Sequence, residues 1–225
     1  MHLAAWLRRR RMRTRKPFGK AVPAEALRIT LCDTNERVID AWLWAFRDSE
    51  DVEIVEGDVL QLEADAVLSP ANSFGDMSGG IDKAIDDHSA GAAQAAAMAA
   101  IREACYGELP VGQALILPMV SRAKRFRYLV VAPTMRTPGD VARTLNAYLA
   151  FRGALVAVQN HNRAGGTRER IRTLAASGLC TGVGGMDPGI AAEQMIAAHR
   201  NITTGFWEKV VHPAMAPFPS GPRRE

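Results

Sequence analysis

The sequence predicts an α/β fold of three layers, with helices on both faces of a central mixed, largely parallel sheet of about six strands. Short apolar runs alternate with segments of helical periodicity, and this alternation is typical of parallel strands joined by helices. Two apolar runs, 113–117 and 128–132, lie too close together for a crossover helix, so part of the sheet is expected to be antiparallel. The chain has 225 residues, 48% of them hydrophobic, which suits one sizeable core.

The individual elements follow from apolar runs bounded by turn residues and from helical spacing. Strands are expected at 27–32, 52–55, 66–68, 113–117, 128–132 and 171–175. Helices are expected at 35–46, 80–104, 138–158 and 188–199. The second of these helices should break near Ser89, because Ser-Ala-Gly interrupts an otherwise alanine-rich helical pattern.

Positive charge is concentrated at the start of the chain. Residues 1–24 contain eight Lys or Arg and no acid, which leaves 20 basic against 24 acidic residues in the rest. We expect a basic disordered extension over 1–24, one domain over 25–212 and a flexible, proline-containing tail over 213–225. The arginines of the extension are expected to make at most non-specific contacts with anionic partners.

Other features restrict the class of protein. No apolar run approaches the roughly 20 residues that a membrane-spanning helix needs, and no secretory signal follows the basic start, so we expect a cytoplasmic protein with no membrane contact. The three cysteines, Cys32, Cys105 and Cys180, are far apart and form no CxxC pair. Neither a disulfide framework nor a metal site is predicted, and no cofactor is implied.

Two glycine-rich loops carry the functional prediction. The first runs from Ser69 through Asn72 and Gly79-Gly80 to Asp82, and the second from Cys180 through Gly182 to Asp187-Pro188. Each leads from a strand into a helix, where ligands bind in open α/β sheets. Glycine lets backbone N–H groups turn toward an anion, and the helix N-terminus adds a favourable dipole. Two such loops in one domain predict a bound diphosphate, although neither loop is a P-loop.

At these residues the sequence resembles the macro domain family, whose members bind ADP-ribose. The resemblance runs from about Leu27 to about His199 and includes Glu56-Gly-Asp58-Val59, Leu68-Ser-Pro-Ala-Asn72, Gly79-Gly-Ile-Asp82 and Thr181-Gly-Val-Gly-Gly185. It is closest to a bacterial and phage-associated branch that reads SPANSFG and APTMR, here Ser69 to Gly75 and Ala132 to Arg136. The resemblance implies a macro-type fold and ADP-ribose, free or attached to a substrate, as the partner.

The resemblance also implies roles for individual residues. Asp58 would accept the adenine amino group, Asn72 would hold the distal ribose, and Asp82 would position or deprotonate a water, so Asn72 and Asp82 are the candidate catalytic residues. The expected ligand-binding residues are Asp58, Val59, Ser69, Asn72, Gly79, Gly80, Ile81, Thr181, Gly182, Val183, Gly184, Gly185 and Met186. Gly184 stands where many relatives carry a Phe or Tyr against the distal ribose.

Simpler explanations and other activities stay open at this point. Asp58 could cap a turn, Asn72 could satisfy its own loop, and Asp82 could only favour a helix start. The protein could hydrolyse O-acetyl-ADP-ribose, remove ADP-ribose from proteins, or only read ADP-ribose marks without catalysis. A further alternative is an S-adenosylmethionine-dependent methyltransferase, because the segment from Ile29 to Asn35 resembles a strand and acidic residue that hold an adenosine ribose.

Overall fold

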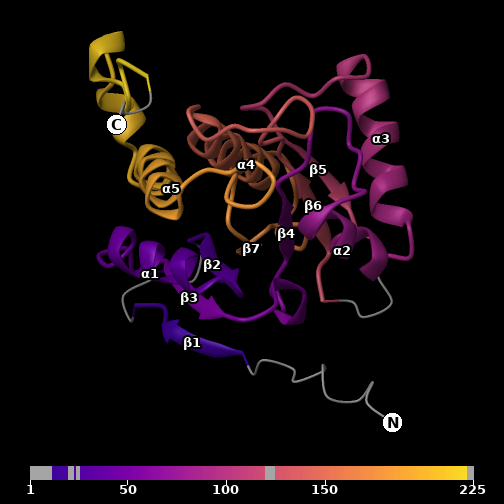
Figure 1. Cartoon of the computed structure of the whole chain (residues 1–225), viewed down its shortest axis with the longest axis horizontal. Coiled ribbons are helices and arrows are strands. Elements are labelled where there is room, and N and C mark those ends of the chain that lie inside the picture. Colours follow the sequence, from indigo (N-terminus) through magenta and orange to yellow (C-terminus); the bar gives the residue numbers. More distant parts are fainter. Residues whose placement is uncertain (1–11, 20–22, 24–25, 120–124, 222–225) are drawn as a thin grey trace.

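The computed structural model describes residues 12–19, 23, 26–119 and 125–221. Within these residues it contains seven strands and five α-helices (Figure 1). The strands are β1 Arg13–Lys16, β2 Arg28–Asp33, β3 Val52–Glu56, β4 Ala66–Ser69, β5 Leu115–Pro118, β6 Tyr128–Val131 and β7 Thr173–Ala176. The α-helices are α1 Glu36–Ala45, α2 Gly80–His88, α3 Ala92–Cys105, α4 Asn146–Ala164 and α5 Pro188–Thr203. Three short 3-10 helices lie at Val59–Gln61, Phe206–Lys209 and Pro213–Met215.

All seven strands form one sheet in the order β1-β3-β2-β7-β4-β6-β5. The five inner strands are parallel to their neighbours, whereas β1 runs antiparallel to β3 and β5 antiparallel to β6. The predicted mixed, largely parallel sheet is therefore confirmed, with all six predicted strands and one more at an edge. Because the inner strands point the same way, their carboxyl ends and the loops that follow them meet at one edge of the sheet.

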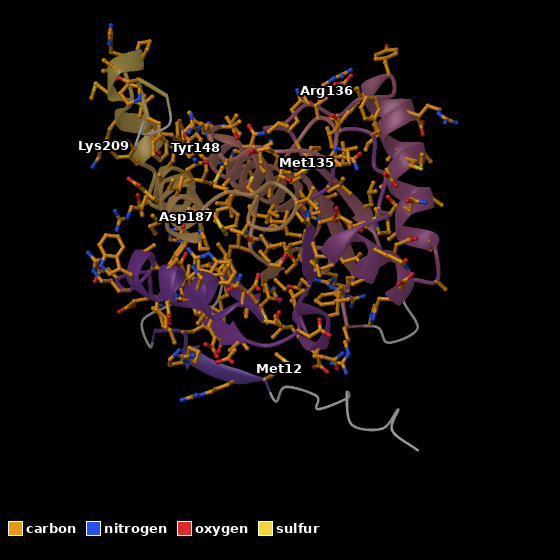
Figure 2. All side chains as sticks on the ribbon, in the orientation of Figure 1. Met12, Met135, Arg136, Tyr148, Asp187 and Lys209 are labelled. Carbon is orange, nitrogen blue, oxygen red and sulfur yellow. The ribbon has the colours of Figure 1, made fainter. Side chains whose placement is uncertain are left out.

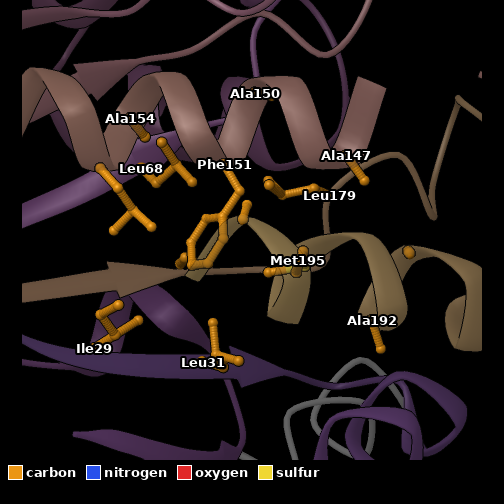
Figure 3. Close-up of a cluster of buried hydrophobic side chains, with 14 of the residues drawn as sticks. Ile29, Leu31, Leu68, Ala147, Ala150, Phe151, Ala154, Leu179, Ala192 and Met195 are labelled. Carbon is orange, nitrogen blue, oxygen red and sulfur yellow. The ribbon is translucent and has the colours of Figure 1, made fainter. Parts of the chain in front are cut away.

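Helices cover both faces of this sheet, as Figure 1 shows. Helices α1, α4 and α5 pack on one face and α2 and α3 on the other, and each face has its own cluster of buried apolar side chains. Figure 3 shows Phe151 of α4 in the larger cluster, between Ile29 and Leu31 of β2 and Met195 of α5. The three predicted layers are thus present.

Two details of the helices bear on the site. The predicted break near Ser89 is confirmed, since α2 ends at His88 and α3 begins at Ala92 after Gly91 in the left-handed region at φ +87°. The helix predicted from residue 138 is wrong at its start, because α4 begins only at Asn146. Residues 138–145 instead form an irregular connection that lies against the second glycine loop, where the Val141 N–H donates to the Gly184 carbonyl at 2.9 Å.

The prediction that residues 1–24 are disordered is wrong for Arg13–Lys16, which form edge strand β1. Arg15 pairs with Glu56 at 3.0 Å, and Lys16 Nζ donates to two backbone carbonyls of the neighbouring segment at 2.6 Å. These basic side chains therefore hold the strand on the sheet. The arginine cluster at residues 8–11 lies outside the described residues.

The predicted flexible tail over 213–225 is also partly ordered. It opens with the 3-10 helix Pro213–Met215, and Phe218 packs edge-on against Tyr148 of α4 with ring centroids 5.7 Å apart. Across the described part of the chain, no helix combines the length and apolar character needed to cross a membrane.

Candidate functional site

A cleft of about 220 Å³ opens at the carboxyl edge of the sheet. Its walls come from three loops that follow neighbouring parallel strands: residues 70–82 after β4, residues 134–138 after β6 and residues 178–184 after β7. Figure 2 shows Met135 and Arg136 on the loop after β6, and Asp187 at the start of α5. The position of the cleft is the one expected of a ligand site in an open α/β sheet.

Asp82 lies in the first turn of α2 and faces the cleft. Its Oδ1 accepts a hydrogen bond of 2.7 Å from the hydroxyl of Ser69, the last residue of β4, which is fully buried. Burial raises the pKa of Asp82 to about 6, while the hydrogen bonds from Ser69 and the Ala71 N–H oppose the rise and the charge of Asp76 adds to it. A carboxyl group with such a pKa can take up a proton near neutral pH.

The start of α2 offers free backbone donors to the cleft. Its N-cap residue, Gly79, supplies no side-chain acceptor, and Gly80 follows in the left-handed region at φ +57°. Both glycines line the cleft and are exposed, and a Cβ at either would meet no atom within 4 Å. The first N–H groups of a helix have no partner within the helix, so this end is suited to an anion.

Asn72 also lines the cleft, but its polar atoms are used within its own loop. Its Nδ2 donates to the Asp76 carbonyl at 2.7 Å, and its Oδ1 accepts from the N–H groups of Phe74 and Asp76. The residue is only 6% exposed. The simpler explanation, that Asn72 shapes the first glycine loop, therefore describes its hydrogen bonds in this structure.

Two glycines of the second loop differ in the space around them. A Cβ at Gly182 would meet nothing within 4 Å, whereas a Cβ at Gly184 would lie 2.6 Å from Val141 Cγ2 and 2.7 Å from the Cys180 carbonyl oxygen. The space that a larger side chain would need at position 184 is thus filled by the 138–145 connection. This connection, rather than an aromatic residue, closes that side of the cleft.

The end of this loop is capped as the sequence predicts. Asp187 is the N-cap of α5 and accepts from the N–H groups of Gly189 and Ile190, with Pro188 at the first helical position. Arg37 of α1 pairs with Asp187 at 3.2 Å. Because the Asp187 carboxylate already occupies this helix start, the α5 dipole is less available to a ligand anion than the start of α2.

Seven of the thirteen predicted ligand-binding residues line the cleft, together with the predicted catalytic residue Asp82. The seven are Asn72, Gly79, Gly80, Ile81, Gly182, Val183 and Gly184. Ser69 lies behind the wall and reaches the cleft only through Asp82.

The other predicted residues lie outside the lining. Val59 and Met186 are buried, and Thr181 and Gly185 are not among the residues that line the cleft. Asp58 is exposed after β3, where its Oδ1 caps the 3-10 helix by accepting from the Leu60 N–H at 3.0 Å. Asp58 lies at the same edge of the sheet as the cleft but is not one of its lining residues. Its contact with adenine therefore stays a prediction.

Sequence reasoning missed several wall residues, chiefly Thr134, Met135, Pro138 and Gly178. Thr134 Oγ1 donates to the Pro70 carbonyl at 2.7 Å, and Met135 forms an isolated bridge with Asn72, so the loops after β6 and β4 are joined directly. The APTMR segment was the available signal, because it follows a strand whose carboxyl end lies at the site.

The charge of the cleft is unusual for an anion site. Among the described residues that line it there is no Lys or Arg, and its only acids are Asp76 and Asp82. Burial raises the pKa of Cys180 to about 12, so this wall residue stays a neutral thiol. In the described part of the chain no cluster of His, Cys, Asp or Glu could hold a metal ion. An anion in this cleft would therefore be bound by backbone N–H groups.

The geometry defines the class of protein: an α/β domain with a glycine-lined cleft at the carboxyl edge of its sheet. The sequence profile of the macro domain family matches residues 68–195, which include the three wall loops. The chain belongs to the macro domain family.

Two relatives are 30% or more identical to this chain. An uncharacterised protein of Aeropyrum pernix is 32% identical over 158 residues, 69% of this chain and 73% of the relative. A macro domain-containing protein of Cupriavidus necator is 30% identical over 158 residues, 67% of this chain and 81% of the relative.

Solved structures share the fold at lower identity. The macrodomain of Mycobacterium tuberculosis DarG matches with a TM-score of 0.51 at 19% identity, over 65% of this chain and 88% of that one. Thermosipho africanus DarTG in complex with ADP-ribose matches with a TM-score of 0.52 at 18% identity, over 68% of this chain and 38% of that one.

Proposed function

We propose that the protein binds ADP-ribose in the cleft at the carboxyl edge of its sheet. The observation that carries this proposal is the pair of glycine loops that line one cleft, the first of which ends at the open start of α2. Family membership supports the choice of ligand, as does the Thermosipho africanus protein of the same fold, which was solved in complex with ADP-ribose.

The proposed orientation follows from the available donors. The diphosphate lies between the N–H groups at Gly79-Gly80 and those at Gly182 to Gly184, because the lining offers it no cationic side chain. The adenine points toward Asp58 after β3, and the distal ribose toward Asn72 and Asp82. Pro138 lines the cleft together with Gly184, and Val141 fills the space that a side chain at position 184 would need.

We further propose that Asp82 makes the site hydrolytic toward O-acetyl-ADP-ribose or ADP-ribosylated protein. A water would attack C1″ of the distal ribose, or the ester carbon on that ribose. Its oxygen would join that carbon as the bond to the leaving group breaks. Its proton would pass to Asp82 or a phosphate oxygen, and the leaving group would take up a proton in turn. A carboxylate whose pKa burial raises to about 6 is a suitable base near neutral pH.

A non-catalytic ADP-ribose reader is the second candidate. The observation that favours it is the engagement of both polar groups of Asn72 in the loop backbone, which leaves them less free to orient a ribose. The methyltransferase alternative has no comparable support. It assigned the ribose to Asp33, whose two carboxylate oxygens accept from the N–H groups of Asn35 and Gly178.

Asp82→Asn distinguishes the two candidates. A hydrolase loses turnover of O-acetyl-ADP-ribose or of an ADP-ribosylated protein while its affinity for ADP-ribose is kept, whereas a reader shows no turnover in the parent protein. Asp87→Asn is the matched control, because Asp87 lies on the same helix but is exposed and paired with Lys83. Equal loss of turnover in both variants would remove the assigned role of Asp82.

Non-specific anionic contacts of the arginine-rich start, and a cytoplasmic location, stay predictions from sequence.

A further inference from the structure

The hydroxyl of Ser69 is placed to control the carboxylate of Asp82. Ser69 ends β4 with no exposed surface, and its Oγ lies 2.7 Å from Asp82 Oδ1 across the loop that joins the strand to α2. A strand end is a rigid point of attachment, while Asp82 is on the first turn of a nine-residue helix. The contact therefore links the sheet to the side chain that faces the cleft.

We propose that Ser69 is a positioning residue that holds the Asp82 carboxylate in one orientation in the cleft and keeps it ionised, thereby setting the acid limit of turnover. The part that concerns turnover rests on the proposed hydrolysis. The part that concerns the carboxylate does not, because it depends only on the contact between two side chains.

The surroundings of Asp82 leave this task to few groups. The neighbouring wall acid, Asp76, opposes ionisation, and the walls at residues 134–138 and 178–184 bring no charged side chain to the cleft lining. Cys180 on the far wall is a neutral thiol because burial raises its pKa. On α2 itself Lys83 is paired with the exposed Asp87, and Asp86 Oδ1 accepts from the Gln94 N–H.

Within the described part of the chain, the hydrogen bonds that favour the ionised carboxylate come from the Ser69 hydroxyl and the Ala71 N–H. A hydrogen bond to the charged form favours that form, so loss of either donor should make Asp82 harder to ionise. Mutation can remove the first donor but not the second, which makes Ser69 the residue to test.

The test is the pKa of Asp82, measured by pH titration of its side-chain carboxyl carbon by NMR in the full chain. Ser69→Ala should raise this pKa by about one unit or more, since hydrogen bonds to charged groups are among the stronger ones. Ser69→Thr, which keeps the hydroxyl, should return it toward the parent value. Ser177→Ala is the matched control, because Ser177 is a buried serine just after β7 whose hydroxyl has no partner in the described structure.

The kinetic readout is the pH profile of hydrolysis. In Ser69→Ala the acid limb should move up by about one pH unit and kcat should fall, while the Kd for ADP-ribose is unchanged, because a base must be ionised to act. An Asp82 pKa that is the same in parent, Ser69→Ala and Ser177→Ala would overturn the proposal. If the parent protein shows no turnover, hydrolysis fails as a function, and the NMR titration still decides whether Ser69 controls Asp82.

Discussion

The fit of Val141 against Gly184 predicts that a single methyl group at position 184 disturbs the site. A Cβ there would lie 2.6 Å from Val141 Cγ2 and 2.7 Å from the Cys180 carbonyl oxygen, about 1 Å inside a normal contact. Neither neighbour moves freely, because the Val141 N–H donates to the Gly184 carbonyl and the Cys180 carbonyl accepts from the Met186 N–H at 3.0 Å.

Overpacking of this kind costs about 1–3 kcal/mol, so Gly184→Ala should lower the free energy of unfolding by that amount, seen as a lower urea midpoint at an unchanged m-value. For a chain of this size the melting temperature should fall by roughly 2–12 °C. Affinity for ADP-ribose should fall as well, because the displaced loop forms one wall of the cleft.

Gly182→Ala is the matched control, since a Cβ at Gly182 meets nothing within 4 Å. Its unfolding free energy should stay within about 0.5 kcal/mol of the parent, or rise slightly. The double variant Gly184→Ala/Val141→Ala should recover part of the loss, because it removes one of the two close contacts. Equal stability of Gly184→Ala and Gly182→Ala would refute the reasoning, because it would mean that residues 138–145 do not lie against the loop.

Three further predictions concern stability. Phe151→Ala should lower the free energy of unfolding in urea by about 3–5 kcal/mol, because the ring is fully buried. Leu149→Ala on the same helix, where the side chain is 37% exposed, should cost about 1 kcal/mol or less. Similar losses in the two variants would contradict the assigned core. Asp187→Ala should cost about 0.5–2 kcal/mol of stability through loss of the α5 cap. Arg37→Ala removes only the exposed ion pair and should cost about 0–1 kcal/mol. A larger loss of melting temperature in Arg37→Ala than in Asp187→Ala would be inconsistent with the cap. Burial raises the pKa of Asp82 from 3.8 to about 6, so the folded state binds more protons than the unfolded state between these pH values. Above pH 6 the ionised carboxylate therefore destabilises the fold, by at most about 3 kcal/mol. Asp82→Asn should therefore be more stable than the parent at pH 7.5, with a difference that shrinks as pH falls from about 6 to about 4; a difference that does not depend on pH would rule out the raised pKa.

The sequence was informative wherever local patterns reflect the sheet. Apolar runs located the five inner strands and edge strand β5. The change from strand to helix located both glycine loops, which lie at one edge of the sheet. The Asp187-Pro188 start of α5 was also readable, because cap chemistry depends on adjacent residues.

Other features depend on tertiary contacts that one sequence does not reveal. Strand β1 reads Arg-Thr-Arg-Lys and has no apolar alternation, because it is held by backbone pairing with β3 and by polar contacts of its long side chains. Helix α4 starts late, at Asn146, and Val141 in the segment before it packs on Gly184, a contact that local sequence does not encode. The pairing of Ser69 with Asp82 joins residues 13 positions apart in a loop whose path could not be predicted from spacing.

The central claim is that the cleft binds ADP-ribose, and calorimetric titration of the full chain with ADP-ribose tests it most directly. AMP, ADP and S-adenosylmethionine serve as comparison ligands, and Asp58→Ala tests the adenine end of the proposed orientation. The account predicts saturable binding of ADP-ribose that is weaker in Asp58→Ala and stronger than the binding of S-adenosylmethionine. Absence of saturable binding of ADP-ribose, or a preference for S-adenosylmethionine, would contradict it.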